Sequence, residues 1–380
     1  MSTMERILRL MHEKKASDLY LSANAPALIK INGQTVPINS QILTVDMPRS
    51  LLAEVVAPEN MAELETSGEL NIALSMVGVG RFRVSAMRQR GTYAVVIRYI
   101  NGEIPSLDSL NVPPVLAELI MAKRGLLLVV GATGAGKSTT LAAMIDHRNQ
   151  NVTGHILTIE EPVEYLFRNK KSVVNQREIG TDTASLQVAL KNALRQAPDV
   201  ILIGEIRDRE TMGAAIAYAQ TGHLCIATLH ANNSHQALNR ILNFYPVEVR
   251  PTMLGDLSTT LRAVVSQRLL RTPTGERVPA VEVLLNTAFV ADLIAKGDFS
   301  GVKEAMEKSI AEGSQTFEAD LARLIAEGRI DRKEGIANAD SANNLMWRLQ
   351  NDFTRKPAQV PADEPEDEAS FTEITLDVKS

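Results

Sequence analysis

The feature that most constrains the fold is a glycine-rich segment placed between an apolar run and a helical pattern. Residues 126–130 read Leu-Leu-Leu-Val-Val, and the next eight residues read Gly131-Ala-Thr-Gly-Ala-Gly-Lys-Ser138. This segment fits the pattern G-x-x-x-x-G-K-[ST], in which glycines let successive backbone N–H groups point at phosphate oxygens. A helix expected from Lys137 onward adds the positive end of its dipole. The segment therefore predicts a phosphate-binding loop between a strand and a helix.

The loop assigns chemistry to individual side chains. The Lys137 ammonium is expected to neutralise charge on the β- and γ-phosphates, and the Ser138 hydroxyl is expected to bind Mg²⁺. ATP and Mg²⁺ are therefore the predicted cofactors. The predicted nucleotide-binding residues are Gly131, Ala132, Thr133, Gly134, Ala135, Gly136, Lys137, Ser138 and Thr139.

Strand and helix patterns alternate on either side of this loop. We expect strands at 126–130, 155–160, 199–203 and 224–229, and helices at 137–149, 184–196, 211–220 and 234–244. Such alternation is typical of parallel strands joined by crossover helices, so the fold class is α/β. From Arg250 to about Asn351 the pattern is mostly helical.

The first third of the chain shows a different pattern. Residues 4–13 have helical spacing, and Asn32-Gly33 lies between two extended runs, which is a strong hairpin signal. A second hairpin is expected with strands at 71–77 and 81–87, a further strand at 92–99, and a helix at 48–65. These elements predict an α+β domain on a largely antiparallel sheet.

With 380 residues the chain exceeds the usual size of one hydrophobic core, so two domains are expected. We predict an N-terminal domain at 1–100, a linker rich in Pro, Gly, Asn and Ser at 101–114, and a second domain at 115–352. Residues 353–380 form an acidic tail, and the segment from Val360 holds seven acidic residues and one lysine. This composition favours disorder, with or without a specific role.

Composition disfavours several classes of protein. The net charge of −5 lacks the basic surplus usual in proteins that track nucleic acid. Cys225 is the only cysteine, so an internal disulfide and a cysteine-based metal site are excluded. Neither a signal peptide nor an apolar run of membrane-spanning length is recognisable, so a cytoplasmic protein without direct membrane insertion is expected.

Carboxylates follow two of the expected strands at the edge where open parallel sheets place their sites. The apolar run 198–205 ends in Glu205, which is expected to help hold Mg²⁺ together with Ser138. Residues 157–164 carry Glu160, Glu161 and Glu164, and a carboxylate there can orient or deprotonate the attacking water. The alternative without a catalytic role is a solvated acidic turn. We favour Glu160 and Glu164 over Glu161.

Two histidines bracket the strand at 224–229. His230 lies at the same edge as the carboxylates, where it can sense the γ-phosphate or serve as an ordinary satisfied polar group. His223 lies at the opposite end, so a structural role is favoured on geometry.

Arginines of the first domain form a third set of candidates. Arg81 and Arg83 are two residues apart on a strand and share one face, while Phe82 and Val84 face the core. Arg98 lies on the next strand. Exposed strand arginines are mostly solvated, but in oligomeric ATPases such residues often complete a neighbouring site.

Five segments occur in one order: the glycine-rich loop, Thr158-Ile-Glu-Glu-Pro-Val-Glu164, Gln176-Arg-Glu-Ile-Gly180, Ile203-Gly-Glu-Ile-Arg-Asp208, and Thr221-Gly-His223 with Thr228-Leu-His-Ala231. Together they resemble the secretion ATPase superfamily, and specifically the type IV pilus retraction ATPases of the PilT/PilU family. On this resemblance they include the four motifs of the family, which are the Walker A motif, the aspartate box, an atypical Walker B motif and the histidine box. The resemblance covers about residues 1–350, including 16–19 and 80–84.

The resemblance implies a PAS-like N-terminal domain, a RecA-like ATPase domain with C-terminal helices, and a homo-hexameric ring. ATP would lie between the two domains, with Arg81, Arg83 or Arg98 closing the site. Glu205 and the aspartate-box glutamates would act on Mg²⁺ and water, and both histidines would be functional.

Details of the resemblance favour the PilU branch. Assembly motors carry an N-terminal extension and four zinc-binding cysteines, whereas this chain has one cysteine. Residues 288–295 read Ala-Phe-Val-Ala-Asp-Leu-Ile-Ala and lack both arginines of the corresponding PilT segment, and 195–199 also departs from PilT. An accessory retraction ATPase is implied, at the cytoplasmic face of the inner membrane at the pilus base. Its implied partners are a PilT-like ATPase and the inner-membrane pilus platform protein.

Two alternatives stay open from the sequence. One is a ring that binds ATP but acts mainly as a scaffold for a partner motor. The other is a conjugation-type DNA motor, which the acidic balance disfavours, since we expect no nucleic-acid partner.

Overall fold

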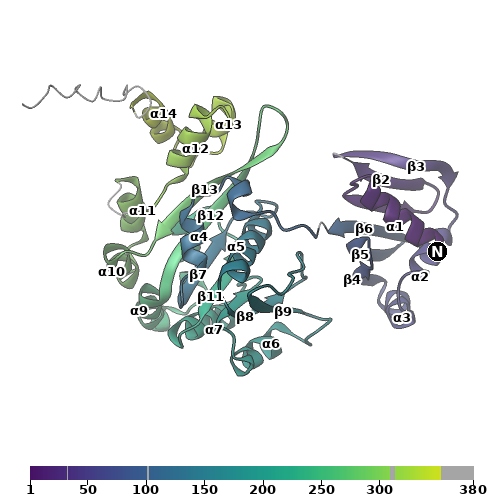
Figure 1. The fold of residues 1–380 in the computed structure, drawn as a ribbon, viewed down its shortest axis with the longest axis horizontal. Coiled ribbons are helices and arrows are strands. Elements are labelled where there is room, and N and C mark those ends of the chain that lie inside the picture. The colour runs from purple at the N-terminus through teal and green to yellow at the C-terminus, as the bar shows by residue number, and fades with distance from the viewer. Residues whose placement is uncertain (32, 101, 309–312, 352–380) are drawn as a thin grey trace, which may run out of the picture.

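The computed structural model describes residues 1–351 apart from 32, 101 and 309–312, and it contains two β-sheets joined by an extended segment (Figure 1). The predicted acidic tail at 353–380 lies outside the described residues. We call the unit built on the first sheet the first domain and the unit built on the other sheet the second domain.

The first domain is a six-stranded antiparallel sheet with the strand order β3-β2-β1-β6-β5-β4. Its elements are α1 (Thr3–Glu13), β1 (Asp18–Ser22), β2 (Pro26–Ile31), β3 (Gln34–Ile42), α2 (Met47–Ala53), α3 (Pro58–Ser67), β4 (Glu69–Met76), β5 (Gly80–Gln89) and β6 (Thr92–Ile100). Both predicted hairpins are confirmed, and Gly33 takes the positive φ of +82° that the first turn requires.

The single helix expected at 48–65 is wrong. The structure has two helices, α2 and α3, and the second begins at Pro58. Ala57 is extended, as the residue before a proline prefers to be, and this breaks the helical path. Strand β1 was also not predicted.

Strand β5 fixes which side chains of the first domain face its core. Phe82 and Val84 are fully buried and pack in a cluster with Met4 and Leu8 of α1. Arg81 and Arg83 alternate with these buried residues along β5 and are only partly buried, so they lie on the opposite face of the sheet. The predicted alternation is therefore confirmed.

The second domain is a seven-stranded sheet with the order β13-β12-β7-β11-β10-β8-β9. All neighbouring strands are parallel except β12 and β13. The strands are β7 (Gly125–Val130), β8 (Gly154–Glu160), β9 (Ser172–Glu178), β10 (Val200–Ile203), β11 (Leu224–Leu229), β12 (Leu261–Arg271) and β13 (Arg277–Leu285). Strand β7, which leads into the glycine-rich loop, is fully buried near the middle of the sheet.

Helices cover this sheet and extend beyond it (Figure 1). They are α4 (Val115–Ile120), α5 (Lys137–Asn151), α6 (Leu186–Ala193), α7 (Arg209–Gln220), α8 (Ser234–Asn243), α9 (Arg250–Thr260), α10 (Ala288–Lys296), α11 (Phe299–Glu307), α12 (Phe317–Ala326), α13 (Arg332–Ala337) and α14 (Ala342–Asn351), with 3₁₀ turns η1 (Leu107–Leu110), η2 (Leu194–Gln196) and η3 (Val247–Val249). The helix expected at 184–196 is α6 followed by η2. The linker predicted at 101–114 contains η1.

The expectation of a mostly helical segment from Arg250 onward is wrong for residues 261–285, which form β12 and β13. Both strands are buried on both faces along most of their length, so they lack the alternation of polar and apolar residues that marks a half-exposed strand. Strand β9 was missed for another reason, since Asn175, Gln176 and Arg177 make it polar, and it lies at the edge of the sheet.

Two further observations concern the only cysteine and the length of the helices. Cys225 is fully buried in β11, and burial raises the pKa of its thiol. Among the described residues, we find no helix with the length and apolar character needed to span a membrane.

Candidate functional site

The glycine-rich loop follows β7 and leads directly into α5. Gly134 and Gly136 adopt φ values of +78° and +86°, which L-residues other than glycine rarely take. The Lys137 ammonium donates hydrogen bonds to the carbonyl oxygens of Gly131, at 2.8 Å, and Ala132, at 2.9 Å. Burial lowers the pKa of Lys137, while nearby Glu205 opposes this shift. The loop thus places one cation at the N-terminus of a helix, as phosphate binding requires.

Gln267 of β12 supports the loop from behind. Its Oε1 accepts a hydrogen bond of 2.8 Å from the hydroxyl of Thr140, on the first turn of α5. A Cβ atom at Gly131 would lie 2.6 Å from the Gln267 carbonyl oxygen, and one at Gly136 would lie 2.7 Å from its Nε2. Close packing against backbone therefore requires glycine at Gly131, and the positive φ of +86° favours it at Gly136. Sequence reasoning missed Gln267 because that segment was expected to be helical.

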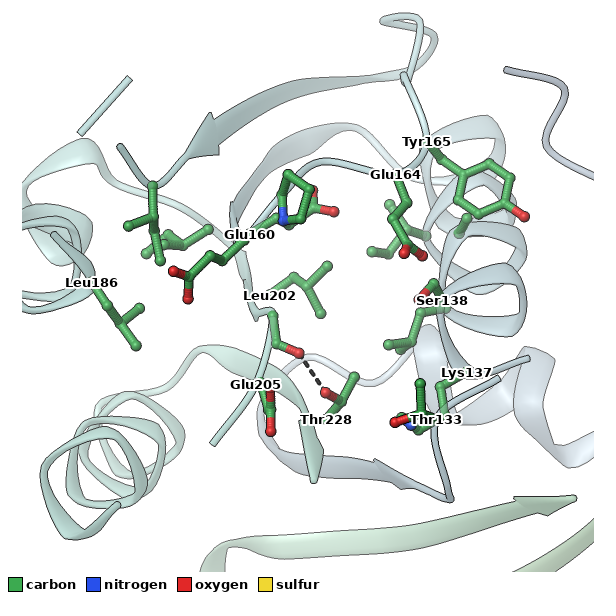
Figure 2. A pocket seen from close by; sticks show the side chains of 18 of the residues that line it. Thr133, Lys137, Ser138, Glu160, Glu164, Tyr165, Leu186, Leu202, Glu205 and Thr228 are labelled. Carbon is green, nitrogen blue, oxygen red and sulfur yellow. Dashed lines mark hydrogen bonds between the residues drawn. The ribbon is translucent and has the colours of Figure 1, made fainter. Parts of the chain in front are cut away.

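A cavity of about 330 Å³ opens beside the loop (Figure 2). It brings together the loop, the strand ends of β8, β10 and β11, and one side chain of the first domain. The lining residues are Arg83, Thr133, Gly134, Lys137, Ser138, Leu141, Ala142, Ile145, Ile159, Glu160, Glu161, Pro162, Glu164, Tyr165, Phe167, Ile179, Leu186, Leu202, Gly204, Glu205, Arg207, Thr228 and His230.

Four polar side chains, Arg207, Glu161, Glu205 and His230, contact one another in series along the cavity. Arg207 Nε lies 2.9 Å from Glu205 Oε2, and Arg207 Nη1 lies 2.8 Å from Glu161 Oε2. His230 Nε2 lies 3.3 Å from Glu205 Oε1. Arg207 is therefore a bridge between the Walker B segment and the aspartate box. Arg207 lies in the predicted Walker B segment but is not among the predicted site residues.

Glu160, at the end of β8, is a partly buried acid that lines the cavity. Its Oε1 accepts hydrogen bonds from the Thr158 hydroxyl at 2.6 Å and from Gln176 Nε2 at 3.2 Å. Burial raises the pKa of Glu160, and these hydrogen bonds partly oppose the shift. A carboxylate with a raised pKa is a better proton acceptor at neutral pH than an exposed one.

The arginines of the first domain lie in three different environments. Arg83 lines the cavity, with its Nη2 3.6 Å from Glu164 Oε1. Arg81 pairs instead with Glu178, at the end of β9. Arg98 pairs with Asp18 of its own domain at 2.8 Å, and the Arg98 guanidinium hydrogen bond lowers the pKa of that carboxyl against the effect of burial. Only one of the three candidates is thus among the cavity-lining residues of the described chain.

The two candidate histidines lie at opposite ends of β11. His230 lies at the carboxyl end of β11 and lines the cavity. The His223 side chain contacts the Tyr218 carbonyl at 3.2 Å and the Thr221 hydroxyl at 3.1 Å, at the amino end of the same strand. The two positions agree with the geometric expectation from the sequence.

Two other side chains of the site were not predicted. The Tyr165 hydroxyl lies 2.8 Å from the Thr139 hydroxyl and so joins the aspartate-box loop to α5. The Thr228 hydroxyl donates to the Gly204 carbonyl, a contact drawn in Figure 2, and links β11 to the end of β10. Both are hydroxyl contacts between segments far apart in the sequence, and no local pattern marks them.

The donor set suits Mg²⁺. The Ser138 hydroxyl and the Glu205 carboxylate both line the cavity beside Lys137, and both are hard oxygen ligands. Within the described part of the chain, no group of three or more His, Cys, Asp or Glu side chains is arranged to hold a metal. A site with one or two protein ligands is the usual one for Mg²⁺, which keeps its waters and takes its remaining ligands from phosphates.

Comparison with known proteins gives consistent relationships. The model of the type II/IV secretion system protein family matches residues 2–326. The chain is 48% identical to the type IV pilus ATPase PilU of Pseudomonas aeruginosa over 347 residues, which are 91% of each chain. It is 36% identical to the type IV pilus retraction ATPase PilT of the same organism, over 89% of this chain and 98% of that one.

A solved structure is similar over nearly the whole described chain. The crystal structure of the pilus retraction motor PilT with bound ADP aligns with a TM-score of 0.86 at 37% identity, covering 91% of this chain and 99% of that one. The expected architecture, a PAS-like α+β domain followed by a RecA-like P-loop domain with C-terminal helices, is confirmed by this similarity together with the two sheets.

Proposed function

The chain belongs to the type II/IV secretion system protein family and is a nucleotide-binding ATPase, and from this premise we propose that it is a hexameric motor supporting type IV pilus retraction. Its role would be that of a PilU-type accessory ATPase in twitching motility. The observation that carries the proposal is the single cavity in which the loop cation Lys137, the carboxylates Glu160, Glu164 and Glu205, and Arg83 of the first domain meet.

The loop side of the cavity binds the phosphates in this proposal. Residues 131–139 present backbone N–H groups, and Lys137 exchanges its two carbonyl contacts for β- and γ-phosphate oxygens. Ser138 and Glu205 would hold Mg²⁺, which supplies neutralisation of phosphate charge when it is bound. The helix dipole of α5 favours the same negative charge.

The carboxylate side orients the attacking water. A water oxygen attacks the γ-phosphorus, the bond to the β–γ bridging oxygen breaks, and the water proton passes to a carboxylate. Glu160 suits that role because burial raises its pKa, and Glu164 and Glu161 are the further candidates. Arg83 would stabilise the charge that develops on the γ-phosphate, with Arg81 and Arg98 as the other first-domain candidates.

The histidines have unequal support. His230 lies 3.3 Å from Glu205, so a change of charge at the γ-phosphate can reach it through that carboxylate. His223 lies at the far end of β11 and stays a candidate on the family resemblance alone.

The proposal extends to assembly and location. The domain division, with a first domain at 1–100, a linker at 101–114 and an ATPase domain at 115–352, gives a subunit for a six-membered ring. The departures from PilT at 288–295 and 195–199 support the accessory role. A PilT-like ATPase and the inner-membrane pilus platform protein are the proposed partners, at the cytoplasmic face of the inner membrane.

One experiment tests the proposal in cells. The gene is deleted, and the strain is complemented with wild type or with the Lys137→Ala variant. We expect retraction against load to fall on deletion and to return only with wild type. Unchanged retraction after deletion would contradict the pilus role.

A second experiment distinguishes a motor from a scaffold. The scaffold alternative is favoured by residues 288–295, which lack the two arginines of the corresponding PilT segment. Purified wild type and Lys137→Ala are compared for ATP turnover and for size, with and without nucleotide. We expect a ring with turnover in wild type and turnover at least 100-fold lower in the variant. Equal turnover in the two proteins, together with full complementation by Lys137→Ala, would establish the scaffold.

A further inference from the structure

Besides Arg83, a second arginine of β5 reaches the ATPase domain, and it does so outside the cavity lining. The Arg81 guanidinium pairs with the Glu178 carboxylate, although the two residues lie 97 positions apart. The side chains are only 15% and 5% exposed. We call this contact the interdomain ion pair. Because both charges are withdrawn from water, each depends on the other for its compensation.

Glu178 is held firmly from the ATPase side. Its Oε2 accepts a hydrogen bond of 3.0 Å from the backbone N–H of Val163, and its Oε1 accepts one of 3.2 Å from the Thr181 hydroxyl. The backbone N–H of Glu178 donates to Asp182 Oδ2 at 2.8 Å. Val163 immediately precedes Glu164 in the aspartate box. The carboxylate that receives Arg81 therefore also holds the loop that carries an acid of the nucleotide site.

Arg81 is held equally firmly from the side of the first domain. It lies on β5, which pairs along its length with β4 and β6. Phe82 and Val84 anchor the strand in the core, so the outward side chains of Arg81 and Arg83 keep a fixed spacing. Wherever the interdomain ion pair places Arg81, the position of the Arg83 backbone is also determined.

In this placement Arg83 lines the cavity. Its Nη2 lies 3.6 Å from Glu164 Oε1, and both side chains are substantially exposed, so this contact alone is weak. The buried interdomain ion pair is the stronger restraint, because separating it would leave an uncompensated buried charge.

We propose that Glu178 is a positioning residue for ATP hydrolysis: its pairing with Arg81 fixes the orientation of the first domain and so delivers Arg83 to the nucleotide site. The inference rests on the proposed role of Arg83. Glu178 itself touches neither nucleotide nor water in this account, and its effect on turnover passes through β5.

The test uses the full-length protein and two matched variants. Glu178→Gln keeps an oxygen that can accept from the Val163 N–H but removes the charge. Arg81→Gln removes the same ion pair from the other domain and leaves the aspartate-box loop untouched. Glu65→Gln is the control, because it removes an exposed ion pair, with Arg49, that stays within the first domain.

Two readouts are measured. The first is the distance between spin labels on Val77→Cys, in the β4–β5 turn, and Val188→Cys, on α6, with labelled subunits diluted in unlabelled ones. Both positions are exposed, and buried Cys225 does not compete for label. The second readout compares ATP turnover with ADP affinity. Turnover reports hydrolysis at the γ-phosphate, whereas ADP affinity reports binding by the loop.

We expect both single variants to broaden or shift the distance distribution in the same way. ATP turnover should fall at least ten-fold and ADP affinity by less than three-fold, with Glu65→Gln matching wild type. Unchanged distances in either single variant, or a turnover loss without a distance change, would overturn the inference. An inactive wild type would instead count against the proposed function, and the distances would still decide whether the ion pair fixes the domains.

The double variant Arg81→Glu with Glu178→Arg supplies a rescue arm. It restores opposite charges across the interface, although it removes the acceptor for Val163. We expect its distance distribution to return toward wild type relative to the two single charge reversals, Arg81→Glu and Glu178→Arg. A double variant as displaced as the sum of the two singles would show that the charges do not interact, and would overturn the inference.

Discussion

The two sides of the nucleotide cavity are built in opposite ways. The phosphate-binding side comes from one stretch, residues 131–139, and Lys137 bonds to carbonyls only five and six positions away. The carboxylate side draws Arg83, Glu160, Glu205 and His230 from four distant segments. Its bridging contact, from Arg207 to Glu161, spans 46 positions.

This difference suggests that nucleotide binding depends mainly on the loop and that hydrolysis depends mainly on the carboxylate side. A contiguous loop recognises phosphates through its own backbone. Substitutions in the loop should therefore lower the affinity for ATP and for ADP. The dispersed carboxylates recognise a reacting geometry that exists only when the segments are assembled. Changes there should spare ADP binding and suppress hydrolysis, and variants on each side can test this division.

The largest effect is expected at Glu205. Glu205→Gln removes the negative charge that faces Arg207 and His230 and that we assign to Mg²⁺. Turnover should fall by about 100- to 1,000-fold, the usual loss when one group that stabilises developing charge is removed. ADP affinity should change by less than about three-fold. Steady-state kinetics and calorimetric titration check this, with exposed Glu210→Gln as the control. A parallel loss of ADP affinity would break the division.

A buried carboxylate outside the cavity lining, Glu282, tests whether every buried acid of the second domain serves catalysis. Glu282 of β13 accepts bonds from the Ser234 N–H at 2.7 Å and the Ser266 hydroxyl at 2.9 Å. Burial raises the pKa of Glu282 from 4.5 to about 7. Between these values the unfolded chain releases a proton that the folded chain keeps, so the free energy of unfolding falls as pH rises, by on the order of 3 kcal/mol in full.

The corresponding variant is Glu282→Gln, which cannot ionise. Urea denaturation at pH 5 and pH 8 should show a smaller loss of stability on raising the pH than in wild type. Turnover at neutral pH should stay within about three-fold of wild type, since Glu282 does not line the cavity. Equal pH dependence in the two proteins would show that the carboxyl ionises without cost in the fold.

On the phosphate side, Gly131→Ala places a Cβ atom 2.6 Å from the Gln267 carbonyl oxygen. The backbone of β12 cannot rotate away, so the loop must move. We expect ADP affinity to fall by about 10- to 100-fold, because loop displacement misaligns several N–H donors at once. Gly134→Ala is the matched variant, with φ of +78° but open space around the added carbon. It should lose only about five- to ten-fold, and a larger loss than at Gly131 would contradict the packing argument.

On the phosphate side, a smaller effect on ADP affinity than that of Gly131→Ala is expected at Gln267. Gln267→Ala removes the partner of the buried Thr140 hydroxyl and should lower the free energy of unfolding by about 1–3 kcal/mol. Its effect on ADP affinity should be less than about ten-fold, because the loop keeps its own backbone conformation. Thermal denaturation with and without ADP checks this. Gln267→Glu keeps the acceptor oxygen and should retain the Thr140 bond.

The sequence predicts the contiguous parts of this structure better than the contacts between distant segments. The loop, the strands beside it and the candidate acids are encoded locally, and the structure places Glu160, Glu164 and Glu205 along one cavity. The interdomain ion pair, with Glu178, was not foreseeable, because charge pairing across 97 positions leaves no periodic signal. Gln267 was not predicted because its strand, β12, was not predicted. A strand buried on both faces resembles a buried helix segment in composition.

The strand order of the second sheet has a consequence for synthesis on the ribosome. All six strands of the first domain lie between residues 18 and 100, so that sheet can close early. Strand β7 ends at Val130, but its two neighbours, β11 and β12, begin only at Leu224 and Leu261. A nascent chain thus carries its phosphate loop on an unpaired, wholly apolar strand while more than 90 further residues are translated. Residues 125–130 are therefore a segment that is exposed to aggregation during this interval.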